Sequence, residues 1–123
     1  RYPDSPSGMP GVQTLMPLLL NEVSKKTISI NNVVELTSFN PIKRFKVKDK
    51  GLIKEGYDAD FTFVDLSMTK KISNKLIQSK CGWTPFHGMK IKGWPVGTMI
   101  NGNRVFWNEK IIGKPTGKPV KFN

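Results

Sequence analysis

The sequence changes its hydrophobic period once, near Lys50, and this change limits the possible folds more than any other feature. Before that point, apolar residues recur at helical spacing over residues 12–23, with Pro17 inside the stretch. Proline removes a backbone donor and clashes with the preceding turn, so we expect this helix to be kinked or to begin late. After Lys50, short runs rich in aromatic and β-branched residues predict strands. We therefore expect an α+β chain, with helices first and antiparallel strands after them.

The boundaries of the expected elements follow from local signals. Ser29 is the predicted N-cap of a second helix, which should stop near Thr37, and Pro41 should open a further short turn of helix. The Asn101-Gly102 pair predicts a hairpin with a type I′ turn. Residues 73–96 read as irregular, and strands are expected at residues 51–53, 60–65, 68–72, 98–100, 104–107 and 110–112.

The chain is strongly basic, with 20 Lys and Arg against 9 Asp and Glu and a formal charge of +11. Such a charge attracts nucleic acid, so a basic nucleic-acid-binding module is one alternative reading. However, arginine occurs only as Arg1, Arg44 and Arg104, and the lysines are scattered along the whole length. Base and phosphate recognition usually relies on the bidentate arginine fork. We interpret the charge as a solvated lysine-rich surface and expect no nucleic-acid partner.

Three features bear on the cellular setting of the chain. Cys81 is the single cysteine, so no internal disulfide can form, which favours the reducing cytoplasm. The longest apolar run, residues 18–20, is far too short to span a bilayer, so no membrane partner is expected. The chain lacks both an initiator Met and a signal-peptide pattern, and we expect it to begin within a longer protein or after processing.

The residues that could perform chemistry do not form a catalytic set. A catalytic metal site needs several converging ligands, and His87 is the single histidine, so we interpret it as a loop residue. Lys80 could lower the pKa of Cys81, but no second histidine completes a Cys-His pair, and we interpret Cys81 as an inert structural thiol. We expect Asp58 and Asp60 to cap a turn through backbone amides.

Two further groups of residues have both a structural and a binding interpretation. Aromatic residues among lysines can stack bases, but a chain poor in aliphatic residues needs its aromatics inside, so we expect a small core from Trp83, Phe86, Trp94 and Phe106. The loop at residues 5–11 presents backbone amides and small side chains before a helix, which suits an anionic group.

Five stretches together resemble one family of enzymes. The strand entry KGLIKEGYDADF (50–61) and the helix ELTSFNPIK (35–43) resemble motifs shared by cyclic amidohydrolases, hydantoinases and allantoinases included. The loop and helix start SPSGMPGVQT (5–14), the segment SKCGWTPFHG (79–88) and the Pro/Gly-rich tail (113–123) resemble dihydroorotases. The resemblance covers nearly the whole chain, and the loop 5–14 and the segment 79–88 narrow it to dihydroorotase.

The resemblance implies a (β/α)8 barrel that carries a β-sandwich built from both chain ends. Residues 1–47 would supply the substrate loop and the last helices of the barrel, and residues 48–123 the C-terminal strands of the sandwich. The family interconverts N-carbamoyl-L-aspartate and dihydroorotate in pyrimidine biosynthesis, with zinc held by histidines, an aspartate and often a carboxylated lysine. A hydantoinase-like or allantoinase-like enzyme, or a non-catalytic homologue, is the alternative within the superfamily.

The site residues that the resemblance carries over are few. The family's metal ligands lie upstream of the position that matches Arg1, so we expect no catalytic residue and no metal ligand in this chain, and zinc only in the full-length parent. The backbone at Ser7 and Gly8 would touch the substrate, with Pro6 and Pro10 fixing the loop. The expected partners are the small-molecule substrate, the rest of the same polypeptide and further copies in a homo-oligomer. By itself the chain should be inactive.

Overall fold

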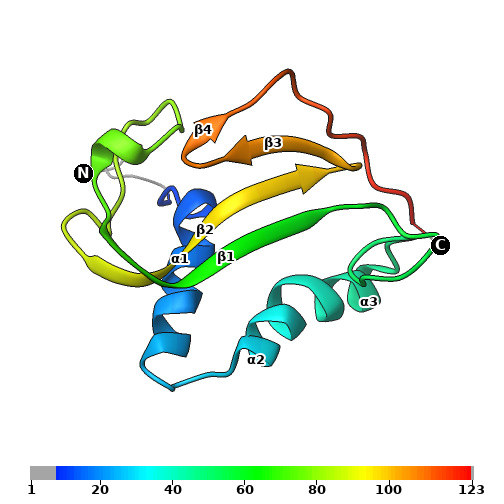
Figure 1. Cartoon of the computed structure of the whole chain (residues 1–123), viewed down its shortest axis with the longest axis horizontal. Coiled ribbons are helices and arrows are strands. Elements are labelled where there is room, and N and C mark those ends of the chain that lie inside the picture. The colour runs from blue at the N-terminus through cyan, green and yellow to red at the C-terminus, as the bar shows by residue number, and fades with distance from the viewer. Residues whose placement is uncertain (1–7, 123) are drawn as a thin grey trace.

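Helices occupy the first part of the chain and strands the second, in a computed structural model that describes residues 8–122 (Figure 1). The helical elements are α1 (Val12–Ser24), α2 (Ile30–Val34), the π-helical turn η1 (Glu35–Phe39) and α3 (Asn40–Phe45). The later elements are β1 (Phe61–Lys71), the 3-10 turn η2 (Asn74–Leu76), β2 (Lys90–Ile100), β3 (Asn103–Trp107) and β4 (Lys110–Ile111). The four strands form one antiparallel sheet in the order β1-β2-β3-β4. The expected α+β arrangement is confirmed.

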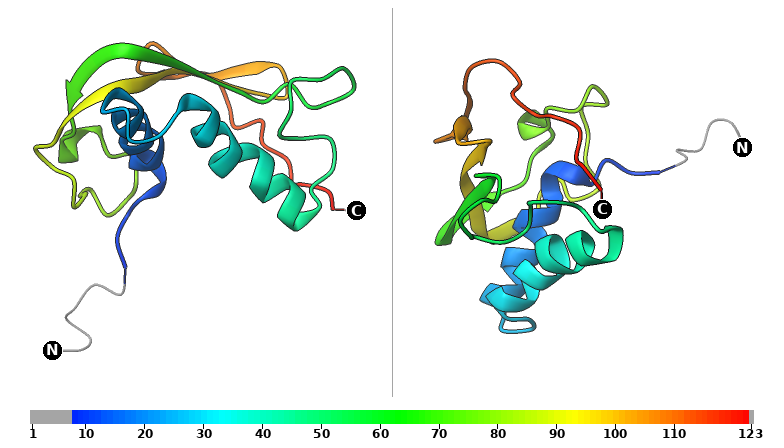
Figure 2. Two further views of the ribbon diagram at one scale, coloured as in Figure 1. Left: turned by 90° about the horizontal axis from the view of Figure 1, so that it is seen from below. Right: turned by 90° about the vertical axis from the view of Figure 1, so that its right-hand side faces the viewer.

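The core lies where α1 packs on the sheet, with the helices on one side of it (Figure 2). Its buried apolar side chains are aliphatic: Leu20, Val33, Ile72 and Ile91. A core of the four aromatic residues named above was therefore wrong. Trp83 is 36% exposed, and the other three are half-buried. These side chains come from α1 (Leu20), from α2 (Val33), from β2 (Ile91) and from the residue that follows β1 (Ile72).

Helix α1 includes Pro17 and begins five residues before it, so a late start at the proline was wrong. The helix loses one hydrogen bond, the one that an N–H at position 17 would donate to the Gln13 carbonyl. The proline ring is fully buried, which offsets this loss. Across residues 8–122, no helix has the length and apolar character that crossing a membrane requires.

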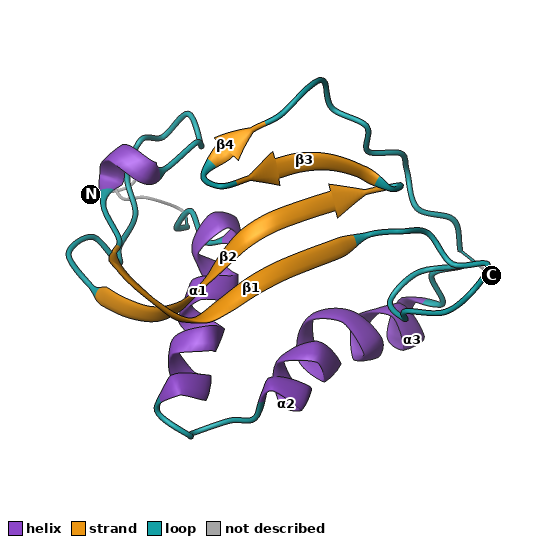
Figure 3. Cartoon of the chain, viewed as in Figure 1, coloured by secondary structure: helices purple, strands orange, loops and turns teal. Residues whose placement is uncertain are grey.

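The second helical segment confirms its predicted cap and extends past its predicted end (Figure 3). The Ser29 hydroxyl accepts a hydrogen bond from the Asn32 N–H at 3.1 Å, and the Asn32 side chain accepts from the Ser29 N–H at 2.9 Å. The helical course does not stop near Thr37. It passes through η1, where the Asn40 N–H bonds to the Glu35 carbonyl five residues back. This wider turn admits Pro41, whose ring would clash with an ordinary α-helical carbonyl.

The sheet confirms the hairpin and corrects three strand boundaries. Asn101 and Gly102 have φ angles of 49° and 76°, as a type I′ turn requires. The strands expected at 60–65 and 68–72 are one strand, β1, with register shifts along its length. β2 begins at Lys90, inside the stretch expected to be irregular. Residues 51–53 do not form a strand: Gly51, with a φ of 84°, and Leu52 form a bend, and Gly51 lies against Ile42.

Two glycines of β2 allow large side chains to lie directly over the strand. A Cβ at Gly93 would be 2.6 Å from the Cβ of Leu20 on α1. A Cβ at Gly97 would be 2.5 Å from the ring of Trp107. The Trp107 ring also contacts the Phe63 ring, at a centroid distance of 5.2 Å. These two glycines obscure the strand pattern of β2 in the sequence. In the structure they allow α1 and the Trp107 ring to lie close to the strand.

We predict that Gly93→Ala destabilises the protein by about 3 kcal/mol, since it adds a steric clash with Leu20 to the strain of a φ of 96°. Gly102→Ala is the matched control, because it also has a positive φ but nothing within 4 Å of the new methyl group. We expect Gly102→Ala to cost about 1 kcal/mol. Urea unfolding measures both, and equal losses would show that the α1–β2 approach does not matter.

Candidate functional site

The loop expected to contact a substrate leads directly into α1. Ser7 and Pro6 lie outside the described residues, and Gly8 is exposed with nothing within 4 Å of where a Cβ would sit. The carbonyl of Gly11 accepts hydrogen bonds from the N–H groups of Thr14 at 3.2 Å and Leu15 at 3.0 Å, which starts the helix. The space beside Gly8 is open to a ligand, and the substrate contacts of Ser7 and Gly8 stay predictions.

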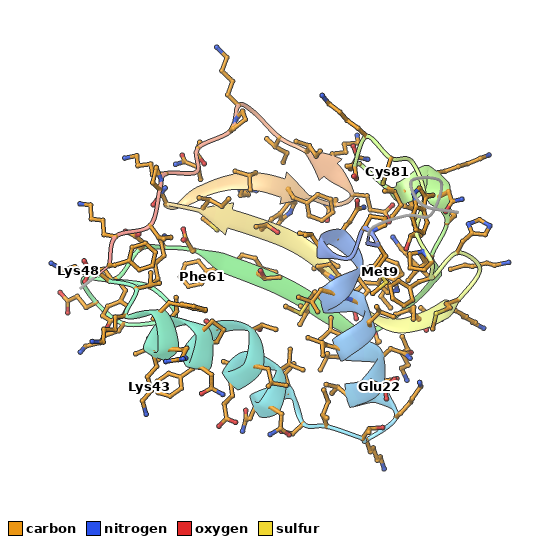
Figure 4. The ribbon with its side chains drawn as sticks, turned by 180° about the vertical axis from the view of Figure 1, so that it is seen from behind. Met9, Glu22, Lys43, Lys48, Phe61 and Cys81 are labelled. Atoms are coloured by element: carbon orange, nitrogen blue, oxygen red, sulfur yellow. The ribbon has the colours of Figure 1, made fainter. Side chains whose placement is uncertain are left out.

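Gln13, in the first turn of α1, links this loop to a distant segment. Its Nε2 donates to the Leu76 carbonyl at 2.6 Å, and its Oε1 accepts from the Gln78 N–H at 2.9 Å. Gln78 immediately precedes the segment 79–88, so the two stretches that narrow the family resemblance lie side by side. Figure 4 shows Met9 at the start of α1 and Cys81 on the neighbouring loop. Sequence reasoning missed Gln13, although it lies within the stretch 5–14.

Behind this bridge lies a cavity of about 420 Å³ between α1, residues 75–78 and the sheet. Its walls include the side chains of Ile72, Trp94 and Phe106, with Gln13 and Thr14 at the helix side. The Thr14 hydroxyl is already used, because it bonds to the Gly11 carbonyl at 3.2 Å. The cavity is mainly apolar, and of the charged residues that line it, Lys70 and Glu109 form an ion pair with each other.

His87 has a structural hydrogen bond rather than a partner for catalysis. Its Nδ1 accepts the N–H of Asn74 at 3.0 Å, and the Asn74 side chain accepts the N–H of Thr84 at 3.1 Å. These bonds close the loop between η2 and β2 on itself. His87 is exposed and lies in a turn, as expected for a loop residue.

Cys81 is exposed, so it does not pack as a structural thiol, and its expected inertness stays a prediction. A hydrogen bond with the Ser79 side chain lowers the pKa of the Cys81 thiol, and this bond, rather than the charge of Lys80, is the main cause. The Nδ1 atom of His87 already accepts the Asn74 N–H, so this nitrogen is not free to act as a base toward Cys81.

Asp60 and Asp58 share one lysine. Lys50 Nζ lies 2.5 Å from Asp60 and 2.8 Å from Asp58, and the other oxygen of Asp60 accepts the N–H of Asn101 at 2.8 Å. Asp60 thus accepts from a backbone amide, but in the hairpin turn at Asn101 and not in the turn at the entry to its own strand, whereas the Asp58 carboxylate binds Lys50. Partial burial acts to raise the pKa of Asp60, but the bonds from Lys50 and Asn101 outweigh it and lower that pKa. The hydrogen bonds to Asp58 and Asp60 raise the pKa of Lys50.

Metal-binding chemistry is not assembled in the part of the chain that the structure describes. Within residues 8–122, no three His, Cys, Asp or Glu side chains gather closely enough to hold a metal ion. The carboxylates of Asp58 and Asp60 are both paired with Lys50.

Comparison with known proteins gives the family. The model of the amidohydrolase family matches residues 7–105. The chain belongs to this family. It is 42% identical over 114 residues to the dihydroorotase of Pyrococcus furiosus, covering 93% of this chain and 27% of that protein. It is 39% identical over 113 residues to the dihydroorotase of Methanosarcina acetivorans, covering 90% of this chain and 24% of that protein.

Solved structures place this amidohydrolase chain in the same fold as hydantoinases. The L-hydantoinase of Arthrobacter aurescens matches with a TM-score of 0.83 and 31% identity, over 87% of this chain and 24% of that one. A D-hydantoinase matches with a TM-score of 0.83 and 28% identity, over 90% of this chain and 24% of that one. The chain thus spans about a quarter of the length of the relatives it matches.

We predict that Asp60→Asn removes part of the acid sensitivity of this protein. The pKa of Asp60 is lowered in the folded state, so its contribution is present above the ordinary pKa of 3.8 and is lost as pH falls below it. The contribution should be about 0.5–1 kcal/mol, since the pair is partly solvated. Unfolding at pH 3 and pH 6 measures it. Asp49→Asn is the control, and an equal change in both variants would contradict the role of Asp60.

Proposed function

We propose that this chain is the C-terminal portion of a dihydroorotase, an enzyme that interconverts N-carbamoyl-L-aspartate and dihydroorotate in pyrimidine biosynthesis. The observation that carries the proposal is its 42% identity to the dihydroorotase of Pyrococcus furiosus over 93% of the chain. The identity to the structurally similar L-hydantoinase is lower, at 31%. A dihydroorotase and a hydantoinase both hydrolyse a cyclic amide, so the two possibilities differ in the substrate.

In this proposal, α1 to α3 are the last helices of a (β/α)8 barrel, and the sheet β1-β2-β3-β4 belongs to a β-sandwich. The exposure of apolar side chains on the helices supports it, because a barrel would cover them. Val12 is 96% exposed, Phe45 66% and Leu15 53%. Such a surface is expected to be covered by other protein in the assembled molecule. We propose that the rest of the polypeptide covers it and that the enzyme is a cytoplasmic homo-oligomer.

The chemistry would take place outside the residues of this chain. Zinc, which the family resemblance implies, does not fit the donors present here. The single histidine already accepts a hydrogen bond at Nδ1, and no group of three ligands gathers within residues 8–122. The proposed contribution of this chain is the substrate loop that contains Ser7 and Gly8, held at the start of α1.

We predict that the complete polypeptide containing this chain hydrolyses dihydroorotate far better than hydantoin. Dihydroorotate carries a carboxylate that hydantoin lacks, and backbone amides at the loop before a helix suit an anionic group. Steady-state rates on the two compounds, with allantoin as a third, measure the preference. A higher kcat/KM on hydantoin or allantoin would replace dihydroorotase by another cyclic amidohydrolase, and activity on none of them would favour a non-catalytic homologue.

We also predict that this chain, prepared by itself, binds no stoichiometric zinc. One histidine and scattered carboxylates cannot supply the three or four converging ligands that zinc requires. Metal analysis after dialysis against zinc measures the content, and His87→Ala is the control for weak surface binding. One or two tightly bound zinc ions per chain would contradict the proposal.

A further inference from the structure

We propose that Gln13 is a positioning residue for the substrate loop. Its side-chain amide ties the first turn of α1, and with it the end of the loop at residues 8–11, to the backbone of residues 76–78. The inference rests on the proposed function, because that function gives the loop its substrate. Gln13 itself is not placed against the substrate.

The geometry uses both ends of the Gln13 amide. The nitrogen donates to the Leu76 carbonyl at 2.6 Å, and the oxygen accepts from the Gln78 N–H at 2.9 Å. A primary amide offers one donor and one acceptor side by side, so it can match two backbone groups as a neighbouring strand would. Two bonds to fixed backbone groups set the direction of the side chain as well as its distance. Because the bonds are exposed, their net contribution to stability is small, and their main effect is on geometry.

The loop has few other contacts that could fix it. Nothing lies within 4 Å of where a Cβ would sit at Gly8 or Gly11. Met9 is 63% exposed and Val12 is 96% exposed. The described part of the loop is therefore placed mainly by where α1 begins, and Gln13 is the second residue of that helix.

The far end of the bridge is itself held in place. Leu76 closes the turn η2, whose first residue, Asn74, accepts the Thr84 N–H and donates its own N–H to His87. A continuous series of hydrogen bonds thus runs from the segment 79–88 through residues 74–78 to Gln13. This gives the segment 79–88 a role in support of the substrate loop.

The experiment uses the complete polypeptide with Gln13→Ala and Gln13→Glu. Gln78→Ala is the matched control, because residue 78 contributes only its backbone N–H to the bridge. Deuterium uptake is followed for the Gln78 amide and for residues 8–13, together with kcat and KM on dihydroorotate and the melting temperature. Gln13→Glu keeps an acceptor for Gln78 but sets a carboxylate oxygen against the Leu76 carbonyl, so it should not restore the bridge.

In Gln13→Ala we expect faster exchange at Gln78, greater uptake over residues 8–13 and a KM raised roughly tenfold, with a melting temperature close to that of the parent. Gln13→Glu should resemble it, and Gln78→Ala should resemble the parent. Unchanged exchange at Gln78 in Gln13→Ala would overturn the bridge. Faster exchange at Gln78 with unchanged uptake over 8–13 and unchanged KM would overturn the positioning role.

The two proposals fail in different ways. A parent enzyme with no activity on dihydroorotate removes the proposed function, and the uptake over residues 8–13 then decides the positioning role without any kinetic measurement. If the parent is active but Gln13→Ala changes neither the uptake over residues 8–13 nor KM, the positioning role is overturned and the proposed function is unaffected. A fall in melting temperature equal in Gln13→Ala and Gln78→Ala would also overturn it, since the control keeps the bridge.

Discussion

The approach of α1 to β2 is the contact on which the rest of the structure depends. Leu20 lies over Gly93, and both Leu20 and the neighbouring Ile91 are almost completely buried. A hydrogen bond from the Lys92 N–H to the Asn21 side chain, at 3.1 Å, fixes the helix along the strand. Without this contact the helical half and the sheet half would share little buried surface. Burial of apolar surface is the main driving force available to join them.

That contact also decides where the loop proposed to contact the substrate lies. α1 is anchored near its C-terminal half by Leu20, so its first turn projects over the loop between η2 and β2. Gln13 then joins the two at the backbone. The position of this loop thus follows from one packed helix and one amide bridge, and the helices leave apolar side chains such as Val12 and Phe45 exposed.

Elements that depend on neighbours in sequence could be predicted, and elements that depend on distant neighbours could not. The Ser29 cap and the Asn101-Gly102 turn follow from local chemistry that needs no partner. The start of β2 could not be predicted, because Gly93 and Gly97 weaken its strand pattern. The side chains that need these glycines, Leu20 on α1 and Trp107 on β3, are distant in sequence. Residues 51–53 read as a strand, yet Gly51 and Leu52 form a bend, in which Gly51 lies against Ile42.

The sequence alone determined the order of helices and strands, the family resemblance and the lack of enough histidines for a metal centre. The order of helices and strands follows from the hydrophobic period, and the single histidine is a matter of composition. Only the tertiary structure decided the hydrogen-bond partners of Gln13, which are 63 and 65 residues away. Both partners are backbone groups, so the residue types at positions 76 and 78 could not have predicted these hydrogen bonds. The same holds for Leu20, whose place over Gly93 exists only once the helix and the sheet have come together.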